Sequence, residues 1–427
     1  MIIKNADVYT EDGKFVNKDI YIKDGLFVDK EDLAHGKSQK IIPAGKLDAS
    51  VLCSEDEIVI DAAGCYAIPA LTDIHFHGCS GYDFSDGSKE AIDAIARYEA
   101  SVGVANIVPA TMTLPEDELV KICNAARLYQ ADGAARNIYG IDSSDNQICG
   151  EDKSGTKKAR LCGINLEGPF ISPAKKGAQN AEYIRKPDIL LFDKLNAASD
   201  HMIKLVTMAP ELEEAIEFIE KKHDEVIVSL GHTDADYDTS VRAFEKGASH
   251  VTHLYNAMKP YSHRAPGLIG AASDVDGVYV ELICDGVHIH PAAIRAALKI
   301  FGEDRVIFVS DSMRATGLGD GCYSLGGQDV TVAGNLATLQ DGTIAGSVTN
   351  LMECLRIAVL EIGIPLETAV KCAAVNPAKC VGIYDRHGSI SPQKTADIVL
   401  LKKETFEIVQ IIMGKFSYLN PIIQMDK

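Results

Sequence analysis

The sequence predicts an α/β fold: a (β/α)8 barrel of the TIM type, joined to a small β-sandwich domain built from both chain ends. Two observations support this prediction. Short apolar runs alternate with helical stretches along the middle of the chain, which is the pattern of parallel strands connected by helices. Both ends instead carry short segments rich in β-branched and aromatic residues, separated by polar turns. The 427 residues, 46% hydrophobic and 24% charged, have a globular composition and suffice for a barrel of ~250 residues with a further domain.

The N-terminal part begins with three runs typical of short strands, namely Ile2–Tyr9, Asp19–Ile22 and Ile58–Asp61. Before the third run, Lys30–Glu57 is polar, and we expect an irregular surface insertion there. The strand pattern returns in the tail, at Ala396–Lys402 and Glu407–Met413. We therefore expect residues 1–65 and 388–427 to form the small β domain and residues 66–387 to form the barrel.

Eight apolar runs provide the expected barrel strands, and eight is the number that a closed (β/α)8 barrel requires. These runs are Tyr66–His75, Val104–Met112, Leu161–Leu166, Ile203–Met208, Val226–Leu230, His250–His253, Val278–Ile283 and Val306–Val309. The helical candidates are Lys89–Val102, Pro115–Gln130, Leu212–Lys222, Pro291–Phe301, Thr349–Ile362 and Leu366–Asn376. The polar stretch Ile141–Arg160 is expected to be a loop inserted before the third strand.

The charge and composition exclude several classes of protein. The 42 Lys and Arg residues against 61 Asp and Glu residues give a formal net charge of −19, so no basic surplus exists for binding nucleic acid. No apolar run approaches the ~20 residues of a membrane span, and Met1–Glu11 has no signal-peptide pattern. The 11 cysteines form no CxxC pair, which suits reduced thiols and predicts a cytoplasmic enzyme.

Metal-binding side chains gather at the expected carboxyl ends of the barrel strands, where barrel enzymes place their catalytic residues. His75 and His77 end the first run and, being two residues apart on an extended chain, point to the same face. Glu167, His232 and His253 end the third, fifth and sixth runs. Imidazole and carboxylate groups together are ligands for zinc, iron and similar divalent ions. Such an ion lowers the pKa of bound water toward neutrality.

Asp311 ends the eighth run, where it could accept a proton from that water and later pass it to a leaving group. Taken singly, these residues have ordinary interpretations: strand-end histidines are usually hydrogen-bonded, Asp311 could cap a helix, and Glu167 could end a strand. Their joint placement favours a metal site. His290, before a helix that starts at Pro291, is a weaker candidate for contacting a ligand. The remaining histidines are interpreted as ordinary residues: His35, His201, His223, His250, His263 and His387.

Four motifs are more specific than the metal-binding pattern. They are Gly163–Phe170 (GINLEGPF), Gly231–Ala235 (GHTDA), His253–Met258 (HLYNAM) and Asp285–His288 (DGVH). With the HFHG segment around His75, they resemble the amidohydrolase superfamily and, within it, the family of N-acetylglucosamine-6-phosphate deacetylases. The resemblance extends over nearly the whole chain.

The resemblance implies a set of metal ligands. Glu167, His232 and His253 would hold the principal ion, and His75 and His77 would complete a second site in which Glu167 is the bridge. The cofactor would be a divalent metal ion (zinc, iron, manganese or cobalt), with one or two ions per subunit.

The resemblance also implies the reaction, which is hydrolysis of N-acetyl-D-glucosamine 6-phosphate to D-glucosamine 6-phosphate and acetate in amino-sugar catabolism. Metal-bound hydroxide would attack the amide, with Asp311 as general base and then general acid. His288 matches a residue beside the scissile amide. Arg264 matches the arginine that holds the phosphate, which in the family can come from the neighbouring subunit, so a homodimer is expected. The other substrate contacts that the match implies are Ala178, Gln179, Asn256, Ala257, Ile344, Ala345 and Gly346.

Other functions remain open at this stage. The nearest alternative is the deacetylase for N-acetylgalactosamine 6-phosphate, whose substrate differs at one hydroxyl. Another amidohydrolase, such as a dihydroorotase or an N-acyl-amino-acid deacylase, would keep the metals and Asp311. Glu167 in place of a carbamylated lysine argues against the dihydroorotase type. A non-catalytic barrel would be expected to have lost ligands, and none is lost here.

Overall fold

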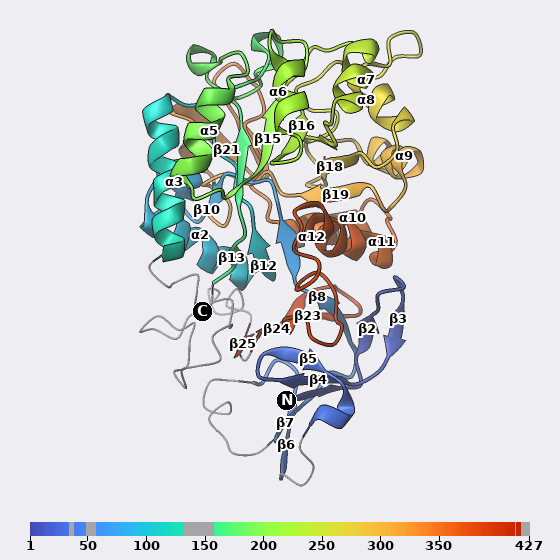
Figure 1. Cartoon of the computed structure of the whole chain (residues 1–427). Helices are drawn as coiled ribbons and strands as arrows, with labels where there is room; N and C mark the ends of the chain where they lie inside the picture. The colour runs from blue at the N-terminus through green and yellow to red at the C-terminus, as the bar shows by residue number, and fades with distance from the viewer. Residues whose placement is uncertain (34–37, 48–56, 132–157, 415, 420–427) are drawn as a thin grey trace.

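The computed structural model describes residues 1–33, 38–47, 57–131, 158–414 and 416–419. Its larger part is a set of parallel strands with helices around them, and a smaller all-β part lies at one end, at the bottom of Figure 1. No helix in these described ranges is long and apolar enough to span a bilayer.

Two parallel sheets form the centre of the larger part. A six-stranded sheet has the order β14-β15-β16-β17-β18-β19, and a three-stranded sheet has the order β13-β12-β9. The strands are β9 (Leu71–Asp73), β12 (Val104–Ile107), β13 (Arg160–Leu161), β14 (Ile164–Glu167), β15 (Ile203–Met208), β16 (Ile227–Leu230), β17 (His250–Val251), β18 (Tyr279–Ile283) and β19 (Val306–Val309). The two sheets are linked at two places: Ala110, beyond β12, bridges Asn165 of β14, and the amide of Asp311, beyond β19, donates to the carbonyl of His75, 2.9 Å away.

Helices flank these strands (Figure 1), and several begin at a residue whose side chain accepts a hydrogen bond from the first turn. Ser88 caps α2, Asp188 caps α5, Asp236 caps α7 and Asn350 caps α10. The helices are α2 (Lys89–Ser101), α3 (Glu116–Ala131), α5 (Ile189–Ala198), α6 (Ala215–Lys222), α7 (Tyr237–Glu245), α8 (Gly267–Asp274), α9 (Pro291–Phe301), α10 (Leu351–Leu360), α11 (Leu366–Val370) and α12 (Asn376–Cys380). The helix expected at Leu366–Asn376 is longer than predicted, because a π-helical turn at Lys371–Val375 joins α11 to α12.

The smaller part contains both ends of the described chain, where β8 pairs with β2 and with β23. One sheet has the order β25-β24-β23-β8-β2-β3 and the other has the order β5-β4-β1-β7-β6. The strands are β1 (Ile2–Lys4), β2 (Asp7–Tyr9), β3 (Phe15–Asn17), β4 (Ile20–Lys23), β5 (Leu26–Val28), β6 (Gln39–Pro43), β7 (Glu57–Asp61), β8 (Cys65–Pro69), β23 (Asp397–Lys402), β24 (Ile408–Met413) and β25 (Phe416–Leu419). One buried cluster contains side chains from both sheets, among them Ile3, Ile60, Val8 and Ile398.

Some predicted boundaries were wrong. The run Tyr66–His75 contains two strands, because β8 pairs with β23 and β2 in the smaller part while β9 pairs with β12. Ile2–Tyr9 is also two strands, interrupted at Asn5, whose φ is 65°. The expected irregular insertion Lys30–Glu57 includes β6, which pairs in parallel with β7. Most of the expected loop at Ile141–Arg160 lies outside the described residues.

A small antiparallel sheet after β19 was not predicted. It comprises β20 (Gly321–Leu325), β21 (Gln328–Ala333) and β22 (Leu336–Thr338). Its buried side chains, such as Leu325 and Val330, pack with Met112 and Met313 in a cluster of their own. This cluster places the small sheet against the carboxyl ends of the barrel strands. A second short hairpin, β10 (Gly78–Cys79) and β11 (Tyr82–Asp83), follows His77.

Candidate functional site

Three of the predicted ligands converge on one point. Glu167 Oε1 lies 3.1 Å from both His232 Nε2 and His253 Nε2, and the two imidazole nitrogens are 3.0 Å apart. Two ligand atoms at ~2.1 Å from a tetrahedral ion are about 3.4 Å from each other. A divalent ion therefore fits among these three atoms with small adjustments of the side chains.

A second group shares Glu167 with the first. His77 Nε2 lies 3.2 Å from Glu167 Oε2 and 3.4 Å from Asp311 Oδ1. His75 Nε2 lies 3.3 Å from Glu167 Oε1 and 3.8 Å from Asp311 Oδ1. All these side chains are almost completely buried. Glu167 Oε1 thus lies near His75, His232 and His253, and Oε2 lies near His77.

The hydrogen bonds of two of the four imidazoles, His232 and His75, fit metal binding. His232 Nδ1 is 2.9 Å from the carbonyl of Lys175, and a carbonyl only accepts, so Nδ1 carries the proton and Nε2 presents its lone pair. His75 Nδ1 likewise donates to Glu281 Oε2 at 2.7 Å. Metal-bound histidines usually donate their other N–H in this way.

Buried carboxylates give the site a negative electrostatic field. Burial alone would lower the pKa of His75, but Glu281 and Glu167 outweigh burial and hold this pKa well above its ordinary value. Burial is also outweighed at His77, where Asp311 and Glu167 raise the pKa to about 10. A site that favours positive charge this strongly, with several histidine and carboxylate atoms in reach, is suited to a divalent cation.

The backbone is strained where it carries the site residues. His232, His253 and Asp311 have φ values of 47°, 28° and 47°, in a region that costs a non-glycine residue about 1–3 kcal/mol. Each follows the end of a strand, where the chain turns sharply. Gly346 has a φ of 66°, and a Cβ there would lie 3.0 Å from the carbonyl oxygen of Asp311.

A cavity of about 270 Å³ opens beside the ligand groups. Its lining residues are His77, Met112, Glu167, Gly177, Ala178, Gln179, His232, His253, Asn256, Ala257, His288, Asp311, Leu325, Thr343, Ile344 and Gly346. His288 is held in this wall by Asp285, whose Oδ2 is 2.7 Å from His288 Nδ1. Burial opposes protonation of His288, but Asp285 outweighs it and raises the pKa of the imidazole.

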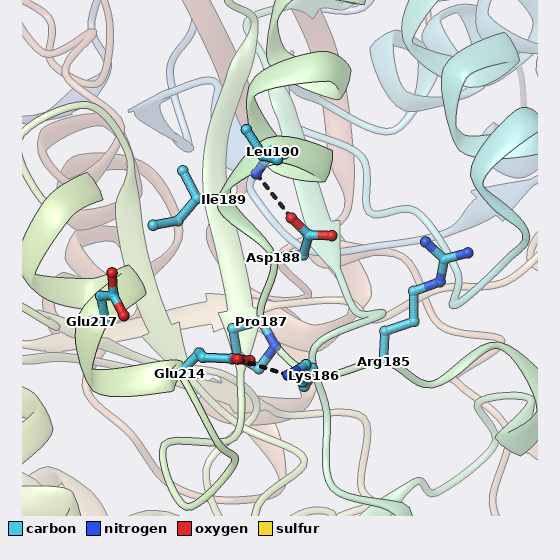
Figure 2. Close-up of a pocket in the computed structure, with 8 residues that line it drawn as sticks. All are labelled: Arg185, Lys186, Pro187, Asp188, Ile189, Leu190, Glu214 and Glu217. Carbon is cyan, nitrogen blue, oxygen red and sulfur yellow. Dashed lines mark hydrogen bonds and ion pairs between the residues drawn. The ribbon is translucent and has the colours of Figure 1, made fainter.

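A larger surface hollow of about 570 Å³ lies elsewhere, beside α5 and α6 (Figure 2). Its charged side chains are already paired or capping: Lys186 Nζ is 2.6 Å from Glu214 Oε1, and Asp188 accepts from the amide of Leu190. None of the predicted site residues lines this hollow. The smaller cavity is therefore the better candidate for an active site.

Comparisons with known proteins identify the family of this chain. Residues 152–425 match the model of the amidohydrolase family. The chain is 38% identical over 354 residues to the N-acetylglucosamine-6-phosphate deacetylase of Bacillus subtilis (strain 168), covering 83% of this chain and 85% of that protein. The chain belongs to the amidohydrolase family.

Two further similarities are to enzymes named for two different acetylated amino-sugar phosphates. The N-acetylgalactosamine-6-phosphate deacetylase of Escherichia coli O157:H7 is 32% identical, over 78% of this chain and 82% of its own. A variant of N-acetyl-D-glucosamine-6-phosphate deacetylase from Mycobacterium smegmatis, solved in complex with N-acetyl-D-glucosamine-6-phosphate, superposes with a TM-score of 0.81. That match covers 98% of both chains at 26% identity.

In this amidohydrolase, most of the residues that were predicted to contact substrate line the cavity. They are Ala178, Gln179, Asn256, Ala257, His288, Ile344 and Gly346. Ala345 is instead wholly buried, in the cluster behind the wall. Arg264 is exposed and does not line the cavity of its own chain. His290 accepts a hydrogen bond from the amide of Ala292 at the start of α9.

Sequence reasoning missed several contributors to the amidohydrolase site. Gln179 Nε2 donates to Glu167 Oε2 at 2.9 Å, a contact that the predicted substrate role did not suggest. Glu281 contacts Nδ1 of His75, and Asp285 contacts Nδ1 of His288. The signal for Glu281 was present, because a carboxylate inside the apolar run Val278–Ile283 needs a buried partner.

Proposed function

We propose that this protein hydrolyses N-acetyl-D-glucosamine 6-phosphate to D-glucosamine 6-phosphate and acetate with the help of a divalent metal ion. The observation that carries the proposal is the position of Glu167. Its two carboxylate oxygens lie 3.1–3.3 Å from four imidazole nitrogens, at the wall of a cavity that also contains Asp311. The relatives that share most of this chain's length support the choice of reaction.

Glu167, His232 and His253 would hold the principal ion, and His75 and His77 would hold a second ion with Glu167 as the bridge. We propose zinc, iron, manganese or cobalt, in one or two copies per subunit, because mixed imidazole and carboxylate ligands suit all four. When bound, the ion would polarise the acetyl carbonyl and lower the pKa of water.

Asp311 is the proposed catalytic acid and base. Its carboxylate lines the cavity, and His77 and His75 oppose the effect of burial and hold its pKa below the ordinary value. Asp311 would take the proton from the attacking water and return it to the departing amine, which is a poor leaving group without that proton. His288, fixed by Asp285, would contact the substrate beside the amide.

The phosphate needs a cation from outside this cavity. None of the described residues that line the cavity is lysine or arginine, and Arg264 is exposed. We therefore propose that Arg264 binds the phosphate across a homodimer, from the neighbouring subunit.

We also propose how the sheets combine into two domains. The two parallel sheets, linked beyond β12 and beyond β19, would form one closed (β/α)8 barrel. The two chain-end sheets, which share a core, would form a small β-sandwich from residues 1–65 and 388–427, with β8 added to it. The described cysteines are free thiols, which is consistent with a cytoplasmic location.

The galacto epimer is the second candidate substrate, because one relative bears that name. The test is release of free amine from N-acetylglucosamine 6-phosphate, N-acetylgalactosamine 6-phosphate and unphosphorylated N-acetylglucosamine in parallel. Preferential turnover of the first supports the proposal, and preferential turnover of the second moves it to the galacto enzyme. No turnover of any of the three, with metal bound, would reject the deacetylase function.

A further inference from the structure

Glu281 has no assigned role, yet it contacts both groups of metal-binding residues. It lies in the middle of β18 and is wholly buried. Its Oε2 accepts from His75 Nδ1 at 2.7 Å and from the backbone amide of His253 at 2.9 Å. One carboxylate oxygen therefore contacts two candidate ligands. It accepts from the side chain of His75, after β9, and from the backbone of His253, after β17.

A row of buried polar side chains on the neighbouring strands leads to Glu281. His250 Nε2 lies 3.7 Å from the other oxygen, Oε1, and His250 Nδ1 is 2.8 Å from Ser229 Oγ. Ser229 Oγ is 2.5 Å from Thr252 Oγ1, which is 2.8 Å from Thr207 Oγ1. These buried groups lie on or directly after β15, β16 and β17, and the row ends at His250, which lies beside Glu281 of β18 without a hydrogen bond to it.

Burial of the Glu281 carboxylate disfavours folding, because the charge loses its contact with water. Glu281 Oε1 has no hydrogen-bond partner among the described residues, and a buried ion pair as a whole can often be replaced by well-packed apolar side chains without loss of stability. The contacts of Oε2 with His75 and His253 suggest what the negative charge is for. A carboxylate that accepts the N–H of a ligand histidine fixes its tautomer and increases the basicity of the nitrogen that faces the metal.

We propose that Glu281 is a positioning residue. It orients the imidazole of His75 so that Nε2 faces a divalent ion, and it fixes the backbone from which the imidazole of His253 projects. This inference rests on the proposed function only in requiring that a divalent ion binds the cluster. It assigns to Glu281 an effect on metal affinity that passes through His75.

The test is a metal titration of the whole chain after chelator treatment, in competition with a chromophoric chelator and with Zn²⁺ as the probe. We expect Glu281→Gln to weaken Zn²⁺ binding 10–100-fold, the usual range for loss of such a partner. Glu281→Leu, which removes the hydrogen bonds as well as the charge, should weaken it at least as much. Glu99→Gln is the matched control, because Glu99 is also a wholly buried glutamate and lies beside Cys79 and Asp73.

A double-mutant cycle separates positioning from a general structural effect. In the His75→Ala background, Glu281→Gln should change Zn²⁺ affinity less than threefold, because its main route to the metal is gone. Unchanged affinity in Glu281→Gln, or an equal loss with and without His75, would overturn the inference. Melting temperatures of the metal-free variants show whether Glu281→Leu has simply failed to fold, in which case Glu281→Gln decides the test.

The outcomes separate this inference from the proposed function. If the wild-type protein binds Zn²⁺ but hydrolyses no acetylated sugar, the function fails and the role of Glu281 can still be confirmed by the titration. If the wild-type protein binds no divalent ion, both are overturned.

Discussion

At the scale of single residues, Asp311 is the group on which the proposed chemistry depends most. Its carboxylate lies 3.4 Å from His77 Nε2, and a φ of 47° holds it at the turn after β19. We expect Asp311→Asn to fold and bind metal, since the amide has the same shape, but to lose kcat by ~100-fold or more because it cannot carry a proton. Asp329→Asn, at an exposed aspartate of β21, is the control. Near-normal turnover of Asp311→Asn would remove Asp311 from the mechanism.

Arg264 allows a second test at this scale. Arg264→Ala should raise KM for the phosphorylated sugar by about 10–100-fold, because a charge-assisted contact to phosphate is lost. Hydrolysis of the unphosphorylated sugar should not change. Arg264→Lys should recover only part of the loss, since lysine lacks the planar fork of arginine. An unchanged KM would place the phosphate elsewhere.

The proposed metal ligands could be found in the sequence because each follows a strand and has a chemistry that packing does not explain. The distances among Glu167, His232 and His253 agree with that expectation. The position of Arg264 relative to the substrate could not be obtained from one chain, because any contact across a dimer involves a second copy. Glu281 was missed because single-strand patterns do not reveal which strands will face each other.

At the scale of elements, the β20–β22 sheet is the feature that shapes the cavity. Leu325 of this sheet lines the cavity, and Gln328 Nε2 donates to the carbonyl of Ala178. This contact ties β21 to the chain segment that carries Gly177, Ala178 and Gln179.

We expect Gln328→Ala to raise KM about 2–10-fold with little change in melting temperature, because one hydrogen bond that positions the cavity wall is lost. Thr331→Ala, at an exposed position of the same strand, should change neither quantity. Steady-state kinetics and thermal unfolding of both variants check this. Equal effects of the two substitutions would show that the contact with Ala178 does not position the wall.

Helices with a strong apolar periodicity could be predicted from the sequence. Strands whose limits depend on which sheet they pair with could not. The structure places α2 and α9 almost where the sequence predicts them. The division of Tyr66–His75 into β8 and β9 could not be predicted, because a continuous apolar run does not reveal that its halves pair with different sheets. The β20–β22 sheet was not predicted because its strands are short and mix buried with exposed side chains, unlike the continuous apolar runs expected of barrel strands.

At the scale of the whole molecule, a buried ion pair joins the two parts. Arg160 of β13 contacts both carboxylate oxygens of Asp397 in β23, at 2.6 and 3.1 Å. Burial would raise the pKa of Asp397, but Arg160 and His387 outweigh it and lower this pKa to about 2.

This pair predicts a specific acid dependence of stability. The unfolded carboxyl, with an ordinary pKa of ~3.9, binds its proton before the folded one does. The pair therefore contributes about 2 kcal/mol that is present above about pH 4 and lost as the pH falls toward 2. Asp397→Asn should be destabilised by about 3–5 kcal/mol at neutral pH. The gap from the wild-type protein should narrow by about 2 kcal/mol in acid, measured by urea unfolding. A gap that does not change with pH would contradict this account of Asp397.

The central claim is that turnover of N-acetylglucosamine 6-phosphate depends on a divalent ion held around Glu167. The most direct measurement is amine release by chelator-stripped protein as Zn²⁺, Mn²⁺, Co²⁺ or Fe²⁺ is added back, with bound metal counted in the same samples. We predict no measurable turnover in the stripped protein and a rise in parallel with metal occupancy for at least one ion, absent in Glu167→Gln. Full turnover by the stripped protein, or by Glu167→Gln, would contradict the account.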